Sequence, residues 1–178
     1  MIITISGLPG SGKSTIGQLL AKKLGYHFYS MGDLRGKMAM DRGMSIDALN
    51  TLGEQEAWTD HEVDEYQKKL AQTEDTFVID GRLSWHFIPQ SFKVFLTVDL
   101  EDGAERIFRR PRPDEPPASS AREVLESIKT RIASDALRYE KWYGVRFDDP
   151  ANYDITIDTT NLTPEAVVEK IMDNLPAA

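Results

Sequence analysis

The sequence lacks cysteine altogether, which excludes disulfide bonds, thiolate nucleophiles and cysteine-ligated metal centres. It also lacks a basic excess, because 21 Lys and Arg residues stand against 29 Asp and Glu residues and give a net charge of −8. That balance argues against binding nucleic acid or acidic membranes by bulk attraction. The N-terminus shows no signal-peptide pattern and no stretch approaches a membrane span, so we expect a cytoplasmic protein.

The chain has the composition of an ordinary globular protein, with 40% hydrophobic and 28% charged residues. Its 178 residues suffice for a single domain, 1–178, with a sizeable core. Short apolar runs alternate with amphipathic segments, which predicts an α/β fold with a parallel sheet covered by helices on both faces. The five predicted strands lie at residues 1–5, 27–30, 76–80, 92–98 and 153–157.

A glycine-rich segment near the N-terminus, residues 7–15, carries the clearest motif. It reads Gly7-Leu8-Pro9-Gly10-Ser11-Gly12-Lys13-Ser14-Thr15 and matches G-x-x-x-x-G-K-[ST] at every fixed position. An uncharged strand pattern precedes it and an amphipathic helix pattern follows it, which is the context that the motif requires. We call it the phosphate loop, because its N–H groups would surround the phosphates of ATP. Lys13 would reach the β- and γ-phosphates, and Ser14 would bind Mg²⁺.

Two further segments are expected beside the phosphate loop, because ligands bind at the carboxyl ends of parallel strands. One is Ser30 to Asp33, which includes Gly32, and the other is Asp80-Gly81-Arg82. Asp80 ends an apolar strand and offers a carboxylate to Mg²⁺. Arg82 offers a guanidinium that can bind a phosphate through two hydrogen bonds.

Arginine is concentrated in the second half of the chain. Arg106, Arg109 and Arg110 share one predicted helix face, while Arg131 and Arg138 lie two turns apart on another helix with Asp135 between them. Four prolines in residues 111–117 forbid a helix between these two segments. The pattern predicts a lid, residues 109–120, that brings arginines to the phosphates and excludes water.

The scattered histidines and helix carboxylates receive no functional role in this interpretation. His27, His61 and His86 are expected to pack or to lie on the surface. Asp41, Asp47 and Asp60 are expected to be solvated charges on helices.

Taken together, these segments resemble the nucleoside monophosphate kinases, and among them the cytidylate kinases of the archaeal type. The resemblance covers nearly the full chain. It is carried by residues 4–15, Ser30-Met31-Gly32-Asp33, Met38-Ala39, residues 42–45, residues 80–83, residues 104–107, Arg138-Tyr139, Tyr143-Gly144 and residues 158–160. It implies a P-loop three-layer fold, a helical monophosphate-binding insert at about 30–72 and the lid described above.

The resemblance also implies a reaction and a set of roles. ATP would donate its γ-phosphoryl group to a nucleoside monophosphate, CMP or dCMP, with Mg²⁺ held by Ser14 and Asp80. Ser30, Gly32, Asp33, Arg35, Asp80, Gly81 and Arg82 would bind the acceptor, while Lys13, Arg82, Arg106, Arg110, Arg131 and Arg138 would neutralise the transferring group. The family's arginine after the serine falls at Gly36 here, so either Arg35 reaches the acceptor phosphate by another route or the acceptor differs.

Three alternatives remain open from the sequence. The first is a P-loop kinase for another acceptor, such as UMP, AMP, a deoxynucleotide or a small metabolite. The second is a nucleotide-dependent switch, since Asp33-Leu34-Arg35-Gly36 matches D-x-x-G, although no N-K-x-D follows. The third is a non-catalytic ATP-binding module. The partners expected are small molecules alone, and the protein is expected to be a monomer.

Overall fold

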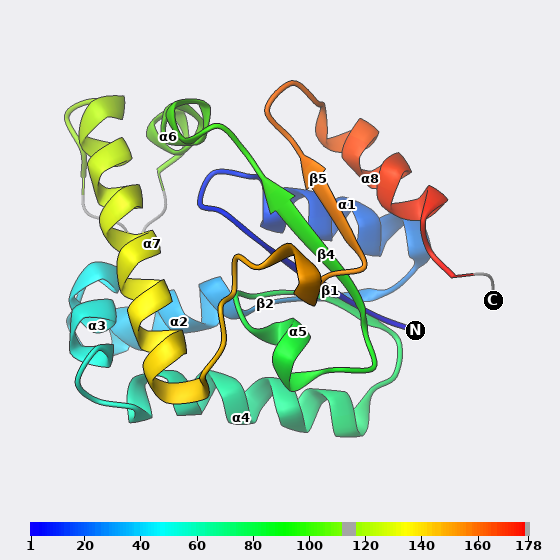
Figure 1. Ribbon diagram of the computed structural model, residues 1–178, viewed down its shortest axis with the longest axis horizontal. Helices are drawn as coiled ribbons and strands as arrows, with labels where there is room; N and C mark the ends of the chain where they lie inside the picture. The colour runs from blue at the N-terminus through cyan, green and yellow to red at the C-terminus, as the bar shows by residue number, and fades with distance from the viewer. Residues whose placement is uncertain (112–116, 177–178) are drawn as a thin grey trace.

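The computed structural model describes residues 1–111 and 117–176 and contains a five-stranded sheet in which each pair of neighbours is parallel. The strand order is β2-β3-β1-β4-β5, so β1 lies at the centre (Figure 1). The predicted parallel sheet is confirmed. The strands are β1 (Ile2–Gly7), β2 (His27–Ser30), β3 (Phe77–Asp80), β4 (Phe92–Thr97) and β5 (Ile155–Asp158).

Each face of the sheet is covered by helices because successive side chains of a strand point to opposite faces. Ile3 and Ile5 of β1 pack in one core cluster with α1 (Lys13–Leu24) and α8 (Pro164–Asp173), which lie side by side in Figure 1. Ile2 packs on the other face, in a cluster with Phe77 of β3 and with three helices. These helices are α2 (Met31–Asp41), α3 (Ile46–Gly53) and α4 (Trp58–Thr73).

Two further helices follow β4 and form the side of the molecule at the left of Figure 1. α6 (Leu100–Arg109) packs on α7 (Ala121–Tyr143) through Ala104, Val124 and Ile128. The Ser120 side chain caps α7, because it accepts a hydrogen bond from the Glu123 N–H. Thr163 caps α8 in the same way, with Pro164 at the first helical position.

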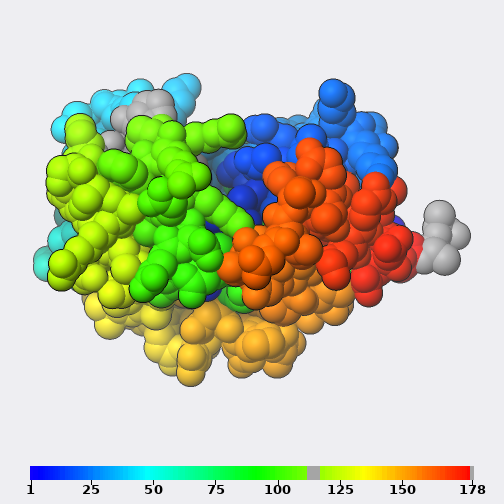
Figure 2. Space-filling model, turned by 90° about the horizontal axis from the view of Figure 1, so that it is seen from above, coloured from blue at the N-terminus to red at the C-terminus, as the bar shows by residue number. Residues whose placement is uncertain are grey.

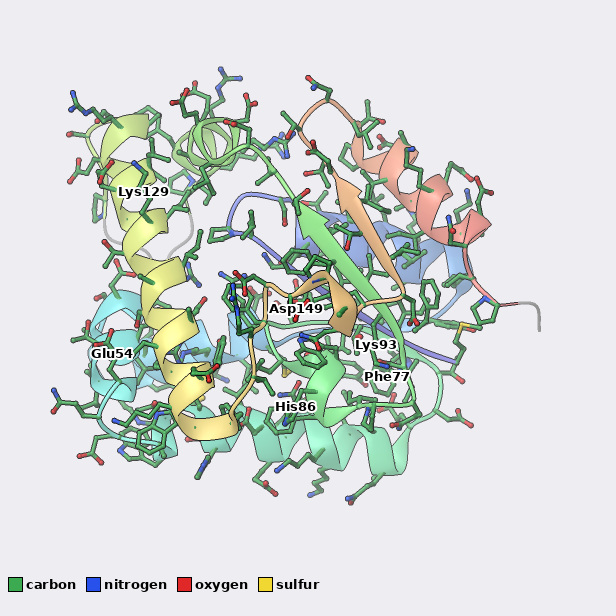
Figure 3. All side chains as sticks on the ribbon, in the orientation of Figure 1. Glu54, Phe77, His86, Lys93, Lys129 and Asp149 are labelled. Carbon is green, nitrogen blue, oxygen red and sulfur yellow. The ribbon has the colours of Figure 1, made fainter. Side chains whose placement is uncertain are left out.

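A short helix that the sequence did not predict, α5 (Ser84–Phe87), follows β3. His86 of this helix, which is labelled in Figure 3, packs against Phe87 and Tyr143. On α6, Phe108 is 38% exposed. Residues 112–116 of the predicted lid lie outside the described residues. No helix in the described part of the chain is long and apolar enough to cross a membrane.

Candidate active site

The phosphate loop turns sharply between β1 and α1. Gly10 and Gly12 have φ angles of 77° and 85°, a region that favours glycine. A Cβ atom on Gly10 would lie 2.5 Å from the Cα atom of Gly103, so the close approach of α6 also requires glycine there. The N-cap residue of α1 is Gly12, and it provides no side-chain cap. The first N–H groups of α1 therefore suit an anion, which would cap the helix in place of a side chain.

The loop lies at the bottom of a depression, where Figure 2 shows its blue atoms between the green and orange segments. Within it, the Lys13 Nζ donates hydrogen bonds to the carbonyl oxygens of Gly7 at 3.0 Å and Leu8 at 2.8 Å. Burial, followed by repulsion from Arg82, lowers the pKa of Lys13 well below its usual value, while Asp80 opposes this shift. The ammonium group thus lies where phosphate oxygens would replace the loop carbonyls as its partners.

Ser14 and Asp80 meet across the sheet edge. The Ser14 hydroxyl donates to Asp80 Oδ2 at 2.5 Å, and Asp80 is only 3% exposed. Burial raises the pKa of Asp80, against the opposing hydrogen bond from Ser14. A hydroxyl and a carboxylate are hard oxygen ligands that fit Mg²⁺, which usually completes its shell with phosphate oxygens and water. No cluster of three His, Asp or Glu metal ligands occurs within the described residues.

The predicted meeting of three segments at one sheet edge is confirmed. Ser30 of β2 pairs in register with Asp80 of β3, and Ser14 contacts Asp80 from the phosphate loop. The Arg82 Nη1 donates to the carbonyl oxygen of Gly7 at 2.5 Å. The topology alone predicted this grouping, because all three segments follow neighbouring parallel strands.

A chain of alternating charges crosses the molecule beside this edge, and we call it the ion-pair chain. Its members are Arg35, Asp60, Arg138, Asp135 and Arg82. Asp60 Oδ1 lies 2.9 Å from Arg35 Nη1 and 2.6 Å from Arg138 Nη1. Asp135 accepts from Arg138 Nη2 at 2.5 Å and from Arg82 Nε at 2.7 Å. The ion-pair chain therefore joins α2 and α4 to α7 and to the loop after β3.

The prediction that Asp60 is a solvated helix charge is wrong. Asp60 is 6% exposed and Arg138 is 1% exposed, so both are buried in the ion-pair chain. Although burial acts in the opposite direction, Arg82 and Arg138 lower the pKa of Asp135 to about 2. The spacing of Asp135 and Arg138 on one helix was visible in the sequence. The partner from α4, 78 residues away, was not.

The remaining predicted arginines occupy different positions. Arg106 donates to the carbonyl oxygens of Gly10, Thr159 and Thr160, so it ties the phosphate loop to the segment after β5. Arg109 pairs with Glu105, and its side chain is 73% exposed. The prediction that Arg110 shares a helix face with these two is wrong, because α6 ends at Arg109 and Arg110 follows as its C-cap. Arg110 and Arg131 line the cavity described next.

One cavity of about 590 Å³ begins at the phosphate loop and ends on α4. Its volume lies within the range typical of small-molecule sites. At the far end it is lined by Asn50, Val63, Asp64 and Gln67, none of which the sequence analysis identified. No motif marks these positions, and no local pattern distinguishes them from other residues of α3 and α4. Arg35, Gly32, Gly81 and Arg82 line the middle of the cavity.

Comparisons with known proteins agree with this geometry. The family model described as the cytidylate kinase-like family matches residues 2–161. A cytidylate kinase from Methanobrevibacter smithii is 34% identical over 175 residues, which cover 98% of each chain. Another from Methanothrix thermoacetophila is 36% identical over 159 residues, covering 89% of this chain and 88% of that one.

Solved structures extend the likeness to the fold. A shikimate kinase from Bacteroides thetaiotaomicron superposes with a TM-score of 0.66 at 17% identity, covering 97% of both chains. The sheet, the phosphate loop and the family match all agree, and the chain belongs to the cytidylate kinase-like family.

Proposed function

We propose that this protein is a nucleoside monophosphate kinase that transfers the γ-phosphoryl group of ATP to CMP or dCMP, giving ADP and the diphosphate. One observation carries the proposal: a single cavity joins the phosphate loop to a polar pocket between α2, α3 and α4. A donor and an acceptor can therefore lie end to end in one cavity, with the transferring group between them. The relatives named cytidylate kinase support CMP as the acceptor.

On the donor side, the phosphate loop would bind ATP through its N–H groups, with Lys13 at the β- and γ-phosphates. Ser14 and Asp80 would hold Mg²⁺, which neutralises charge on the phosphates. Phosphoryl transfer needs little covalent help from the protein and depends on positioning and charge stabilisation. We assign no general base.

On the acceptor side, Ser30, Gly32, Asp33 and Gly81 would form the wall around the monophosphate, and Arg82 would bind its phosphate. Arg110 and Arg131 line the cavity and would neutralise the transferring group. We assign Arg35, Arg106 and Arg138 positioning roles, in which their hydrogen bonds to carboxylates or carbonyl oxygens hold the lining of the cavity in place. The proposal includes one kinase domain with an acceptor insert at about 30–72 and a lid at 109–120, acting as a cytoplasmic monomer.

A coupled assay of ADP release across a panel of acceptors tests this proposal. We expect ATP turnover to require a monophosphate and kcat/KM to be highest with CMP or dCMP. Turnover that is highest with UMP, AMP or shikimate would contradict the acceptor assignment. ADP release that is the same with and without any acceptor would contradict kinase activity itself.

We expect Asp80→Asn to raise the Mg²⁺ concentration for half-maximal activity by about 10–100-fold, as loss of a group supporting a metal typically does. The reason is the contact between Asp80 and Ser14 at the buried sheet edge. A Mg²⁺ titration at saturating ATP measures it. Asp75→Asn, which changes an exposed carboxylate shortly before the same strand, is the control. An identical Mg²⁺ requirement in Asp80→Asn would refute the metal assignment.

We expect Arg82→Ala to weaken CMP binding by roughly 2–5 kcal/mol, the range for truncating one partner of a buried charged pair. Binding of a non-hydrolysable ATP analogue should weaken less, because Lys13 and the loop N–H groups remain. Calorimetry with each ligand separates the two sites. Arg82→Lys keeps the charge but loses the forked contact, so its affinity for CMP should lie between that of the unmutated protein and that of Arg82→Ala. Equal weakening of both ligands would count against this role.

A further inference from the structure

The far end of the cavity is formed by one face of α4. Asp64 and Gln67 both line it, and they are three residues apart, so they lie on the same face of the helix. Both are buried, with exposures of 6% and 2%. Val63 of α4 and Met31 of α2 add apolar surface beside them. A polar pair set in an apolar wall is the arrangement with which ligand sites fix orientation and specificity.

The hydrogen bonds within this pair leave one acceptor without a partner. Gln67 Nε2 donates to Asp64 Oδ1 at 3.4 Å, and the hydroxyl of Tyr143 donates to Asp64 Oδ2. Gln67 Oε1 is buried and has no partner among the described residues. Turning the amide over would place Oε1 against the Asp64 carboxylate, so the carboxylate fixes the orientation that leaves the carbonyl unpaired. Buried polar atoms normally have partners, and since Gln67 lines the cavity, a ligand donor that reaches its amide would supply the missing one.

Asp64 is also an acceptor at neutral pH. Burial raises the pKa of Asp64 to about 6, against the opposing hydrogen bond from Tyr143. The side chain is therefore mostly a carboxylate in the pH range of an ordinary kinase assay. The wall thus presents two acceptors, a carboxylate and an amide carbonyl.

The position of the pair along α4 matches that of a base. Asp60, which binds Arg35 and Arg138 in the ion-pair chain, marks the end of α4 nearer the phosphates. At 1.5 Å per residue, Asp64 and Gln67 lie about 6 and 10 Å further along the helix axis. Those distances are on the scale of the separation between an acceptor phosphate and the far edge of its base.

We propose that Asp64 and Gln67 recognise the exocyclic amine of the acceptor base, so that the site selects cytosine over uracil. The inference rests on the proposed function and names the residues that set its specificity. The N4 amine of cytosine has two N–H donors, one for the Asp64 carboxylate and one for Gln67 Oε1. Uracil carries a carbonyl oxygen at the same place, which would face two acceptors and leave that oxygen and Gln67 Oε1 unpaired. Adenine also carries an amine, so ring size must be selected elsewhere in the cavity.

The test compares kcat/KM for CMP and UMP in the unmutated protein and in three variants. Asp64→Asn replaces one carboxylate oxygen with an amide donor that can pair with the uracil carbonyl. Gln67→Met removes the free acceptor while keeping the length of the side chain. We expect each to lower the ratio of kcat/KM for CMP to that for UMP by about 100-fold, within the range for loss of a matched hydrogen-bonding group. Glu65→Gln, on the exposed side of α4, should leave the ratio unchanged.

The ratio separates base recognition from a structural role. A purely structural role for the pair would lower turnover of both nucleotides by the same factor, and that outcome in both variants would overturn the inference. Thermal melts of each variant show whether it is folded, and Gln67→Met tests the idea without disturbing the Tyr143 contact. If the unmutated protein phosphorylates no monophosphate, both the proposed function and this inference are wrong. If it phosphorylates CMP but the variants keep its selectivity, the inference alone fails.

Discussion

Lys13→Ala is expected to lower kcat/KM for phosphoryl transfer by at least about 10²–10³-fold, the cost of removing one preorganised charge-stabilising donor. The Lys13 ammonium lies in the concave side of the phosphate loop and contacts the carbonyl oxygens of Gly7 and Leu8. A coupled assay at saturating CMP and Mg²⁺ measures the loss. The melting temperature should change little, because the side chain belongs to no core cluster of the described residues.

The matched control for this variant is Lys22→Ala. Lys22 lies in the last turn of the same helix and is exposed, so its removal tests for a general effect of losing one positive charge from α1. Activity in Lys13→Ala close to that of the unmutated protein would refute the assignment of the phosphate loop. A large fall in the melting temperature of Lys13→Ala together with the loss of activity would instead indicate a structural role for Lys13.

Arg138→Ala is expected to produce the largest loss of stability, about 3–5 kcal/mol, as breaking a buried ion pair typically does. Arg138 bridges Asp60 and Asp135 at 2.6 and 2.5 Å, and its removal leaves each buried carboxylate with one partner fewer. Since the free energy of unfolding of a small domain is about 5–15 kcal/mol, this substitution would remove a large share of it. Urea denaturation with a linear extrapolation measures it.

Arg146→Ala provides the comparison within the same protein. Arg146 also pairs with an aspartate, Asp148, but its side chain is 72% exposed. We expect its removal to leave the urea midpoint unchanged, since exposed pairs contribute little. If the two arginine variants unfold at the same urea concentration, the ion-pair chain is not a source of stability.

The sequence predicted those parts of the molecule that local rules govern. The phosphate loop is a contiguous motif that depends on backbone angles open to glycine. Its conformation could therefore be predicted from these few residues alone. Serine and threonine side chains also cap α2, α3, α7 and α8 through local hydrogen bonds, so short sequence patterns determine where these helices begin. The meeting of Ser14, Ser30 and Asp80 followed from topology, because parallel strands end at one edge.

Side chains whose role depends on distant partners could not be predicted. Asp60 is an ordinary helix carboxylate until α7 brings Arg138 against it across 78 residues. Arg106 lines the cavity and contacts the carbonyl oxygens of Thr159 and Thr160, partners more than 50 residues away that no local pattern indicates. Asp64 and Gln67 belong to no motif, and only the shape of the cavity connects them to the phosphate loop.

The central place of β1 in the sheet has a consequence for the order in which the protein can be made. β1 leaves the ribosome first, but its partners β3 and β4 begin at residues 77 and 92, so Ile2, Ile3 and Ile5 have no sheet neighbours until then. The hydroxyl of Thr159 donates to the carbonyl oxygen of Ser11 at 3.1 Å, and Arg106 ties the same two segments together. The nucleotide pocket is therefore incomplete until Thr159 has been made. A chain halted before Phe92 should leave the central strand without one of its two neighbours and exposed to chaperones, whereas a chain halted between β4 and Thr159 should bind ATP poorly and be inactive.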